Sequence, residues 1–126
     1  MASQTVLIVD DDRSFVEALA AFLRENGYRP LPAFSGRAGR DLLKEGEADL
    51  AIIDVHMPDL DGVNLLAESG RLVKSPPVIM ISSDDSVETA ERCRAHGASR
   101  FMVKPVPPDE LLTAITQVLD KHTGEA

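Results

Sequence analysis

The sequence is poor in cysteine, and Cys93 is the only one. A single thiol excludes an internal disulfide and a metal site built from several cysteines. We expect Cys93 to lie half-buried on a helix. Basic residues are also scarce, because 13 Lys and Arg stand against 21 Asp and Glu, which gives a net charge of −8. This acidic balance opposes binding to nucleic acid or to an anionic membrane surface.

Long apolar segments are absent as well. Apolar runs such as residues 6–9 and 78–81 are far too short to cross a bilayer. The first residues show no cationic segment followed by an apolar one, so no secretory signal is visible and we expect a cytoplasmic protein. No repeat, linker or low-complexity segment divides the chain. The 126 residues suit a single domain (1–126), with a core over about 5–121 and a frayed tail over 122–126.

Short apolar runs alternate with amphipathic segments along the chain. The runs predict five β-strands, over residues 5–10, 28–34, 50–54, 78–82 and 101–103. The amphipathic segments predict five helices, over residues 14–26, 36–45, 63–73 and 86–96 and from 107 to near the end. Gly70 weakens the second half of the third helix, which we expect to end early.

This alternation predicts an α/β fold, a doubly wound parallel sheet of five strands in a single (βα)5 unit with helices over both faces. Pro30 and Pro32 remove two backbone N–H donors from the same side of the strand over residues 28–34. Such a strand is tolerated where that side has no partner strand. We therefore expect it at an edge of the sheet.

The stretch over residues 50–62 contains Asp54, the central carboxylate of the candidate site. Four apolar residues run directly into Asp54, and Pro58 and Asp61-Gly62 then break the chain with strong turn signals. A buried strand is expected here, with Asp54 at the carboxyl end, where open α/β sheets place their ligands. Taken alone, Asp54 is better explained as a strand-ending acid that caps the next helix. The ends of the other strands change that interpretation.

Polar side chains follow three further strands at the same edge of the predicted sheet. The first strand ends in Asp10-Asp11-Asp12, the fourth in Ser82-Ser83 and the fifth in Lys104-Pro105. Neighbouring carboxylates repel one another, and a hard divalent cation such as Mg²⁺ relieves that repulsion. A cation, an ammonium and a hydroxyl are also the partners that the oxygens of a transferring phosphoryl group require. The set predicts phosphoryl chemistry with Asp54 as the nucleophile.

At this spacing the set resembles the receiver domain of two-component response regulators, over essentially the whole chain. The resemblance rests on Asp10 and Asp11 after Val-Leu-Ile-Val, on Asp54 in Ile-Ile-Asp-Val-His-Met-Pro-Asp-Leu-Asp-Gly, on Ser82 after Val-Ile-Met-Ile, and on Lys104-Pro105. It implies a flavodoxin-like, CheY-like fold with strand order 2-1-3-4-5.

The resemblance also implies a phosphoacceptor and a metal site. Asp54 would accept a phosphoryl group from a phosphohistidine of a sensor histidine kinase or a phosphotransfer protein, and an acyl phosphate would form. Asp10, Asp11 and Asp54, together with the backbone carbonyl of His56, would hold Mg²⁺ or, in its place, Mn²⁺.

Four further residues take roles by resemblance. Lys104 would pair with the phosphoryl oxygens, and Ser82 would donate its hydroxyl to one of them. The bond between Lys104 and Pro105 is typically cis in this family, which would aim the lysine into the pocket. Phe101 stands where the family has an aromatic residue that turns inward when the hydroxyl-bearing loop closes. Because Phe lacks the hydroxyl of the frequent Tyr, an inward resting rotamer is easier here and the switch is expected to be less sharp.

His56 and Asp84 occupy variable positions that, in the family, influence how fast the phosphoryl group is lost. We interpret His56 as a residue of the pocket rim and not as a metal ligand through its side chain, because no second histidine accompanies it. The remaining polar candidates are interpreted as surface residues (His96 and His122) or as cap and turn residues (Asp12, Asp59 and Asp61).

The implied output is a change in the surface formed by the helix over 86–96, the fifth strand and the last helix, read by an effector domain or a partner protein. A homodimer formed on phosphorylation is compatible with it. The domain itself would bind neither nucleic acid nor membrane, and would catalyse only its own phosphorylation and dephosphorylation. A free-standing receiver and the amino-terminal part of a larger regulator both fit the sequence.

Two other functions compete with this one. Asp10-Asp11-Asp12 also fits the Asp-x-Asp pattern of small aspartyl phosphatases of the haloacid dehalogenase class. There the nucleophilic acid comes first and an acidic pair follows the lysine, whereas here the acidic pair precedes Asp54 and none follows Lys104 at a strand end. A flavodoxin-like nucleotide binder would need a glycine-rich phosphate loop after the first strand, which is missing. We therefore favour the phosphoacceptor switch.

Overall fold

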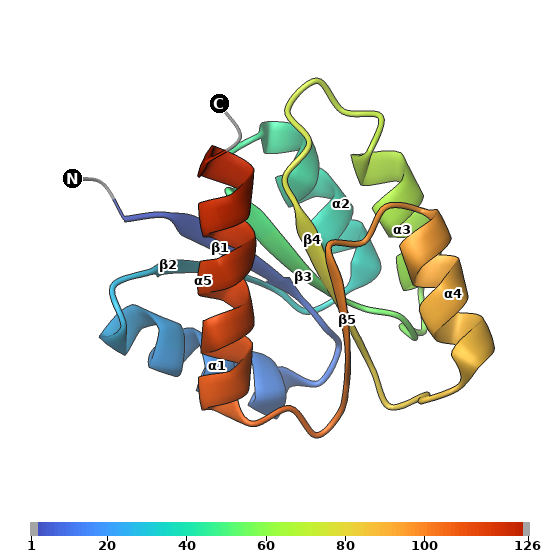
Figure 1. Ribbon diagram of the computed structural model, residues 1–126, viewed down its shortest axis with the longest axis horizontal. Helices are drawn as coiled ribbons and strands as arrows, with labels where there is room; N and C mark the ends of the chain where they lie inside the picture. Colours follow the sequence, from blue (N-terminus) through green and yellow to red (C-terminus); the bar gives the residue numbers. More distant parts are fainter. Residues whose placement is uncertain (1–2, 125–126) are drawn as a thin grey trace.

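The computed structural model describes residues 3–124, which form a parallel five-stranded sheet between two layers of helices (Figure 1). Strands and helices alternate along the chain, which confirms the predicted (βα)5 architecture. The strands are β1 (Thr5–Val9), β2 (Arg29–Ala33), β3 (Leu50–Asp54), β4 (Val78–Ser82) and β5 (Arg100–Val103). The helices are α1 (Arg13–Glu25), α2 (Gly36–Glu45), α3 (Gly62–Ser69), α4 (Val87–Ala95) and α5 (Pro108–Gly124).

The boundaries of the elements follow the sequence prediction closely. α2, β3 and β4 have the predicted bounds, and α3 ends at Ser69, directly before Gly70. At the end of the chain α5 continues to Gly124, so residues 122–124 of the predicted tail belong to a helix. Lys121 and His122 lie in the last turn, where positive charge interacts favourably with the helix dipole. Residues 125 and 126 of the predicted tail lie outside the described residues.

The strand order is β2-β1-β3-β4-β5, as the resemblance implies, and β2 is an edge strand as its prolines predict. The N–H group of Arg29 donates to the carbonyl of Gln4 at 2.9 Å. Successive residues of a strand alternate between its two sides, so Pro30 and Pro32 present their missing donors to the outer side. The two prolines therefore interrupt no hydrogen bond between strands.

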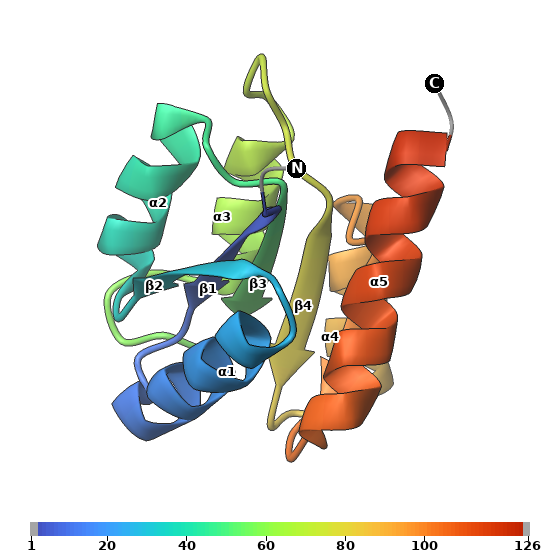
Figure 2. The same cartoon turned by 90° about the vertical axis from the view of Figure 1, so that its left-hand side faces the viewer.

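The two faces of the sheet carry separate apolar cores (Figure 2). Alternation along β1, β3 and β4 directs one set of aliphatic side chains toward α1 and α5, and the other set toward α2, α3 and α4. Ile8 and Ile52 belong to the first core, and Leu7 and Ile53 to the second, and all four are fully buried. Burial on both faces explains why these strands read as unbroken apolar runs.

Cys93 belongs to the second core, and its predicted half-burial is wrong. Its side chain is fully buried on α4. A free cysteine packs as a small apolar residue, and burial raises the pKa of the Cys93 thiol. We therefore assign Cys93 a packing role.

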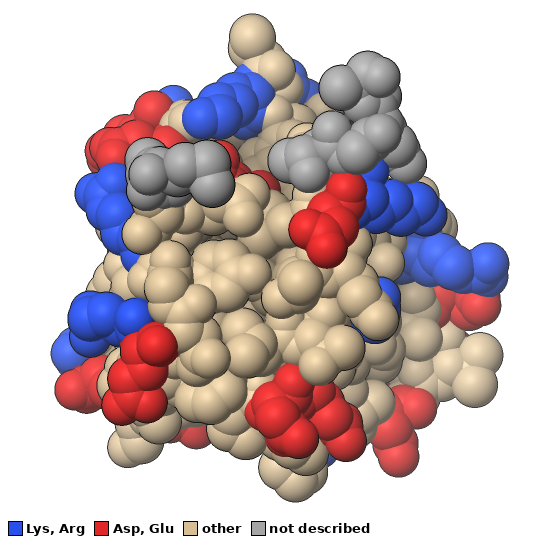
Figure 3. Space-filling model, turned by 60° about the vertical axis from the view of Figure 1, so that its left-hand side comes forward, with Lys and Arg blue, Asp and Glu red and all other residues tan. Residues whose placement is uncertain are grey.

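Charged residues are distributed over the surface without a large basic area on the face shown in Figure 3, where Lys and Arg alternate with Asp and Glu around an uncharged centre. The described helices include none that is both long and apolar enough to span a membrane. Within residues 3–124, charged side chains gather at the carboxyl ends of β1, β3 and β5.

Candidate functional site

Three carboxylates meet where β1 and β3 end. Asp10 directly follows β1, Asp11 is next to it, and Asp54 is the last residue of β3. Their carboxylate oxygens lie within 4.8 Å of one another. Asp10 is fully buried and Asp54 almost so, whereas Asp11 is exposed. Oxygen ligands of this kind, open to solvent on one side, suit a hard divalent cation.

A single lysine compensates the two buried carboxylates. Lys104 follows β5, and its Nζ lies 2.7 Å from Oδ2 of Asp10 and 3.7 Å from Oδ2 of Asp54. The ammonium also stands 4.9 Å from the centre of the Phe15 ring, a favourable cation–π distance. The peptide bond between Lys104 and Pro105 is cis, as the resemblance implies.

The pKa values of the site reflect the shortage of positive charge. Burial raises the pKa of Asp54 to about 6, the Asp10 carboxylate adds to that effect, and Lys104 opposes it. For Lys104, burial acts to lower the pKa, but the hydrogen bond to Asp10 and the charges of Asp54 and Asp10 outweigh it, so the pKa is raised. Lys104 therefore remains an ammonium, while Asp54 holds a proton more firmly than an ordinary aspartate.

Ser82 ends β4 beside this cluster, and its hydroxyl is tied to the following loop. The side chain is fully buried, and its Oγ accepts a hydrogen bond from the N–H of Asp84 at 3.0 Å. The carbonyl of Ser82 accepts a hydrogen bond from the N–H of Lys104 at 2.8 Å. One residue thus links the loop after β4 to the lysine after β5.

Asp84 joins that loop to the start of α4. Its Oδ1 accepts from the N–H of Ser86 at 2.9 Å, and its Oδ2 accepts from the hydroxyl of Thr89 at 2.6 Å. The Thr89 hydroxyl and the donors of Ser86 hold the pKa of Asp84 well below its usual range. From the sequence, Asp84 was identified only as a variable position, and these bonds were not predicted. The combination Asp-x-Ser before a helix was the local signal for them.

His56 connects the loop after β3 to Asp84. Its backbone N–H donates to Oδ1 of Asp54 at 3.4 Å, and its imidazole Nε2 lies 3.5 Å from Oδ2 of Asp84. The side chain is about 62 % exposed. The imidazole thus lies beside the loop after β4, at the rim of the site.

The backbone behind Asp54 is held by Gly62, the first residue of α3. A Cβ atom at this position would lie 2.1 Å from the backbone oxygen of Asp54, so only glycine fits. The N–H of Gly62 donates to the carbonyl of Val55 at 2.7 Å. Asp61-Gly62 is predicted from the sequence as a turn, but this close approach is not, because it depends on a contact with β3.

The predicted cap and turn residues have these roles. Asp12 and Asp61 cap α1 and α3 through bonds to the N–H groups of Phe15 and Val63. Asp59 acts at a distance, because its two oxygens accept from the N–H groups at the start of α2, at Gly36 and Arg37. That role has no signal in the local sequence, since the donors precede Asp59 by more than twenty residues.

Phe101 lies on β5, the strand that precedes Lys104. It is half-buried on β5 and packs against the core under α2, α3 and α4. The structure thus brings Asp10, Asp11, Asp54 and Lys104 together and places Ser82 beside them, while Phe101 packs against the apolar core.

Comparisons with known proteins agree with this geometry. The family model described as response regulator receiver domain matches residues 6–116. The transcriptional regulatory protein GlrR of Escherichia coli (strain K12) is 34% identical over 116 residues, which cover 92% of this chain and 26% of that protein. The chain therefore spans about a quarter of the length of such curated relatives.

Solved structures give the same result. A receiver domain protein of Methanospirillum hungatei JF-1, described as CheY-like, superposes with a TM-score of 0.94 at 29% identity and covers 98% of this chain and 99% of that one. The beryllofluoride-activated NtrC4 receiver domain dimer superposes with a TM-score of 0.86 at 34% identity, over 93% of this chain and 97% of that one.

The raised pKa of Asp54 predicts a pH-dependent gain in stability on Asp54→Asn. The pKa of Asp54 is about 6 in the folded state and about 3.9 in the unfolded state. Protonated Asp54 therefore contributes fully to the stability of the fold below about pH 4, and this contribution is lost as the pH rises through 6. Above that pH the ionised carboxylate costs the wild-type fold roughly 3 kcal/mol, and the amide does not. Urea unfolding in EDTA should show that the free energy of unfolding of the variant increases relative to that of the wild type between pH 4 and 8.

Asp41→Asn, which removes an exposed carboxylate from α2, is the control for the loss of one charge. An Asp54→Asn advantage that is the same at pH 4 and pH 8 would show that Asp54 ionises normally in the folded protein.

Proposed function

The chain belongs to the family of response regulator receiver domains, and we propose that Asp54 is its phosphoacceptor, phosphorylated by a phosphohistidine of a sensor histidine kinase or a phosphotransfer protein. The observation that carries this proposal is the position of Asp54, nearly buried at the end of β3 with Lys104 Nζ 3.7 Å away and two further carboxylates within reach. Asp10 also contacts Lys104 and belongs to the same carboxylate cluster, but its side chain is fully buried, whereas that of Asp54 keeps a small exposed area.

In the proposed transfer, an oxygen of Asp54 forms a bond to phosphorus while the phosphorus–nitrogen bond of the donor breaks and its electron pair stays on the imidazole, which takes up a proton. Lys104 already faces both Asp54 and Asp10, so it is placed to pair with an oxygen of the incoming group. The hydroxyl of Ser82 accepts from Asp84, and its own proton is free to be donated to a second oxygen.

Asp10, Asp11 and Asp54 would hold Mg²⁺ or Mn²⁺, with the backbone carbonyl of His56 as a further ligand. The bound cation would neutralise the carboxylates and the charge on the phosphoryl oxygens. This donor set consists of oxygen alone, which agrees with a hard cation. The exposed imidazole of His56 pairs with Asp84 and takes no part in it.

The proposed output is a switch of the surface formed by α4, β5 and α5. Ser82 would draw the loop after β4 toward the phosphoryl group, and Phe101 would move into the space beside β5. We infer that an effector domain or protein reads this surface, and the NtrC4 receiver dimer supports pairing of two activated copies. We propose that the domain catalyses only its own phosphorylation and dephosphorylation. The family assignment favours this switch over the phosphatase alternative.

The phosphoacceptor is tested with acetyl phosphate and Mg²⁺. Intact-mass measurement should show one added phosphoryl group on the wild type and none on Asp54→Asn, because the amide cannot form the acyl phosphate. Asp41→Asn is the matched control and should be labelled like the wild type. Equal labelling of Asp54→Asn would move the acceptor elsewhere.

The metal site is tested by thermal unfolding. Because a ligand that binds only the folded state stabilises it by mass action, Mg²⁺ at a hundred times its dissociation constant should add about 2.7 kcal/mol and raise Tm by several degrees. Asp11→Asn removes an exposed ligand without disturbing the core and should reduce this rise. Asp85→Asn, an exposed loop residue, is the control. A rise of equal size in Asp11→Asn would remove Asp11 from the site.

The coupling residue is tested with Ser82→Ala. This variant should still accept a phosphoryl group, since Asp54 and Lys104 remain, but it lacks the hydroxyl that joins the pocket to the loop. Hydrogen exchange over residues 83–104, with and without the acyl-phosphate mimic beryllofluoride, should show protection changes in the wild type and much smaller ones in the variant. The same changes in both proteins would mean that the signal leaves the pocket by another route.

A further inference from the structure

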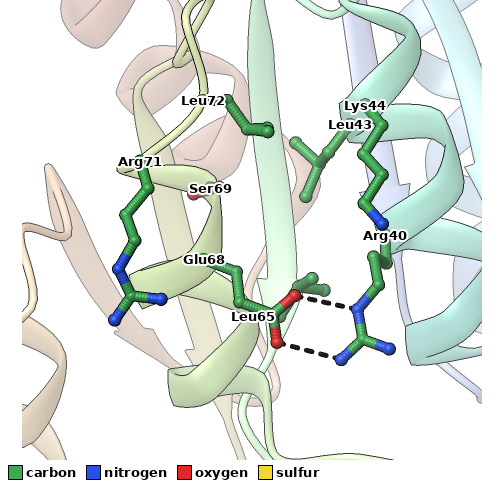
Figure 4. A pocket seen from close by; sticks show the side chains of 8 residues that line it. All are labelled: Arg40, Leu43, Lys44, Leu65, Glu68, Ser69, Arg71 and Leu72. Atoms are coloured by element: carbon green, nitrogen blue, oxygen red, sulfur yellow. Dashed lines mark hydrogen bonds and ion pairs between the residues drawn. The ribbon is translucent and has the colours of Figure 1, made fainter.

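A cavity of about 210 Å³ lies between α2 and α3 (Figure 4). Leu43 of α2, Leu65 of α3 and Leu72, just beyond α3, form its apolar walls, and Leu43 and Leu72 face each other across the gap. Pockets for drug-sized ligands have volumes of about 300–1,000 Å³. This cavity is smaller, and its size suits a single large apolar side chain.

The charges at the mouth of the cavity are unbalanced. Arg40 and Glu68 form a bidentate pair that joins α2 to α3, with the two bonds at 2.8 and 2.9 Å. This pair engages Glu68, the only carboxylate among the lining residues. Lys44 and Arg71 also line the cavity, and neither forms an ion pair within residues 3–124. Two uncompensated cations therefore flank three leucines in a protein with a net charge of −8.

Val73 is an apolar residue that lies next to the cavity in the sequence. It follows Leu72 and is completely exposed. The loop that carries it, between α3 and β4, projects beyond the end of the sheet (Figure 1). A fully exposed valine directly after a lining residue is available for a second apolar contact with the same ligand.

We propose that this groove, lined by Arg40, Leu43, Lys44, Leu65, Arg71 and Leu72, binds an acidic segment of a partner protein that inserts one apolar side chain between α2 and α3. An apolar anchor in a small pocket with a polar rim is the arrangement in which one residue contributes most of the binding energy of an interface. Lys44 and Arg71 select acidic flanks, and the negative charge of the rest of the molecule repels such a segment elsewhere. The groove lies away from Asp54, so this binding does not require phosphorylation.

The proposal is tested by selecting random twelve-residue peptides on the immobilised wild-type protein, with the doubly substituted Lys44→Glu, Arg71→Glu protein as the counter-selection. The enriched peptides should carry Asp or Glu beside one Leu, Met or Phe. Amide shifts in NMR spectra on titration with such a peptide should change at residues 40–44 and 65–73. The affinity should fall at least tenfold in the double variant and several-fold at Val73→Ser, and it should fall with added salt.

Two controls separate this surface from general charge effects and from the switch. Lys121→Glu reverses an exposed charge on α5 and should leave the affinity unchanged. Asp54→Asn should also bind normally, so a failure of the phosphoacceptor assignment leaves this test intact. All substituted positions of the groove are exposed, and the circular dichroism spectra should match that of the wild type. Peptides that lack acidic residues, that bind the double variant equally, or that are not enriched at all would overturn the proposal.

Discussion

The salt bridge between Lys104 and Asp10 is the interaction on which the arrangement of the sheet edge depends. Asp10 is fully buried, and a buried carboxylate without a partner is very costly. Lys104 reaches it from the far side of the sheet, across the ends of β3 and β4, and so fixes β5 relative to β1. One lysine for two buried carboxylates leaves Asp54 undercompensated, which is why burial and Asp10 together raise its pKa to about 6. The site is therefore organised for positive charge that the protein does not itself supply.

The two loops that border Asp54 are held in different ways. Behind it, the loop after β3 is held by the backbone, through the close approach of Gly62 to the oxygen of Asp54 and the bond from Gly62 to Val55. Beside it, the loop after β4 is held by side chains, through Ser82, Asp84 and the hydroxyl of Thr89. Side-chain bonds can be exchanged for bonds to a new group without breaking secondary structure. The physical difference between the loops thus predisposes the β4 side to move and the β3 side to stay.

The sequence was sufficient for the architecture and for the residues of the charged cluster, because both depend on patterns that are local. Unbroken apolar runs identify strands buried on both faces, Pro30 and Pro32 identify an edge, and the polar residues directly after each strand must meet at one side of a parallel sheet. Other features depend on contacts distant in sequence. Nothing near Asp59 in the sequence indicates that it accepts hydrogen bonds from the start of α2. Nothing near Gly62 in the sequence indicates that it packs closely against β3. The sequence also predicts half-burial for Cys93, whereas its position on α4 faces the core.

α3 joins the Asp54 site to the α2–α3 groove, because its two ends lie at these two places. It begins at Gly62, packed against the backbone of Asp54, and ends at Ser69, just before the residues that close the α2–α3 groove. The bidentate Arg40–Glu68 pair fixes the same helix to α2. A phosphoryl group would be added to the side chain of Asp54, whereas α3 contacts its backbone oxygen, so the helix has no direct contact with the chemical change. If the β4 side moves and α3 does not, a partner in the groove would stay bound while the surface of α4, β5 and α5 changes, and the domain could hold one protein while it signals to another.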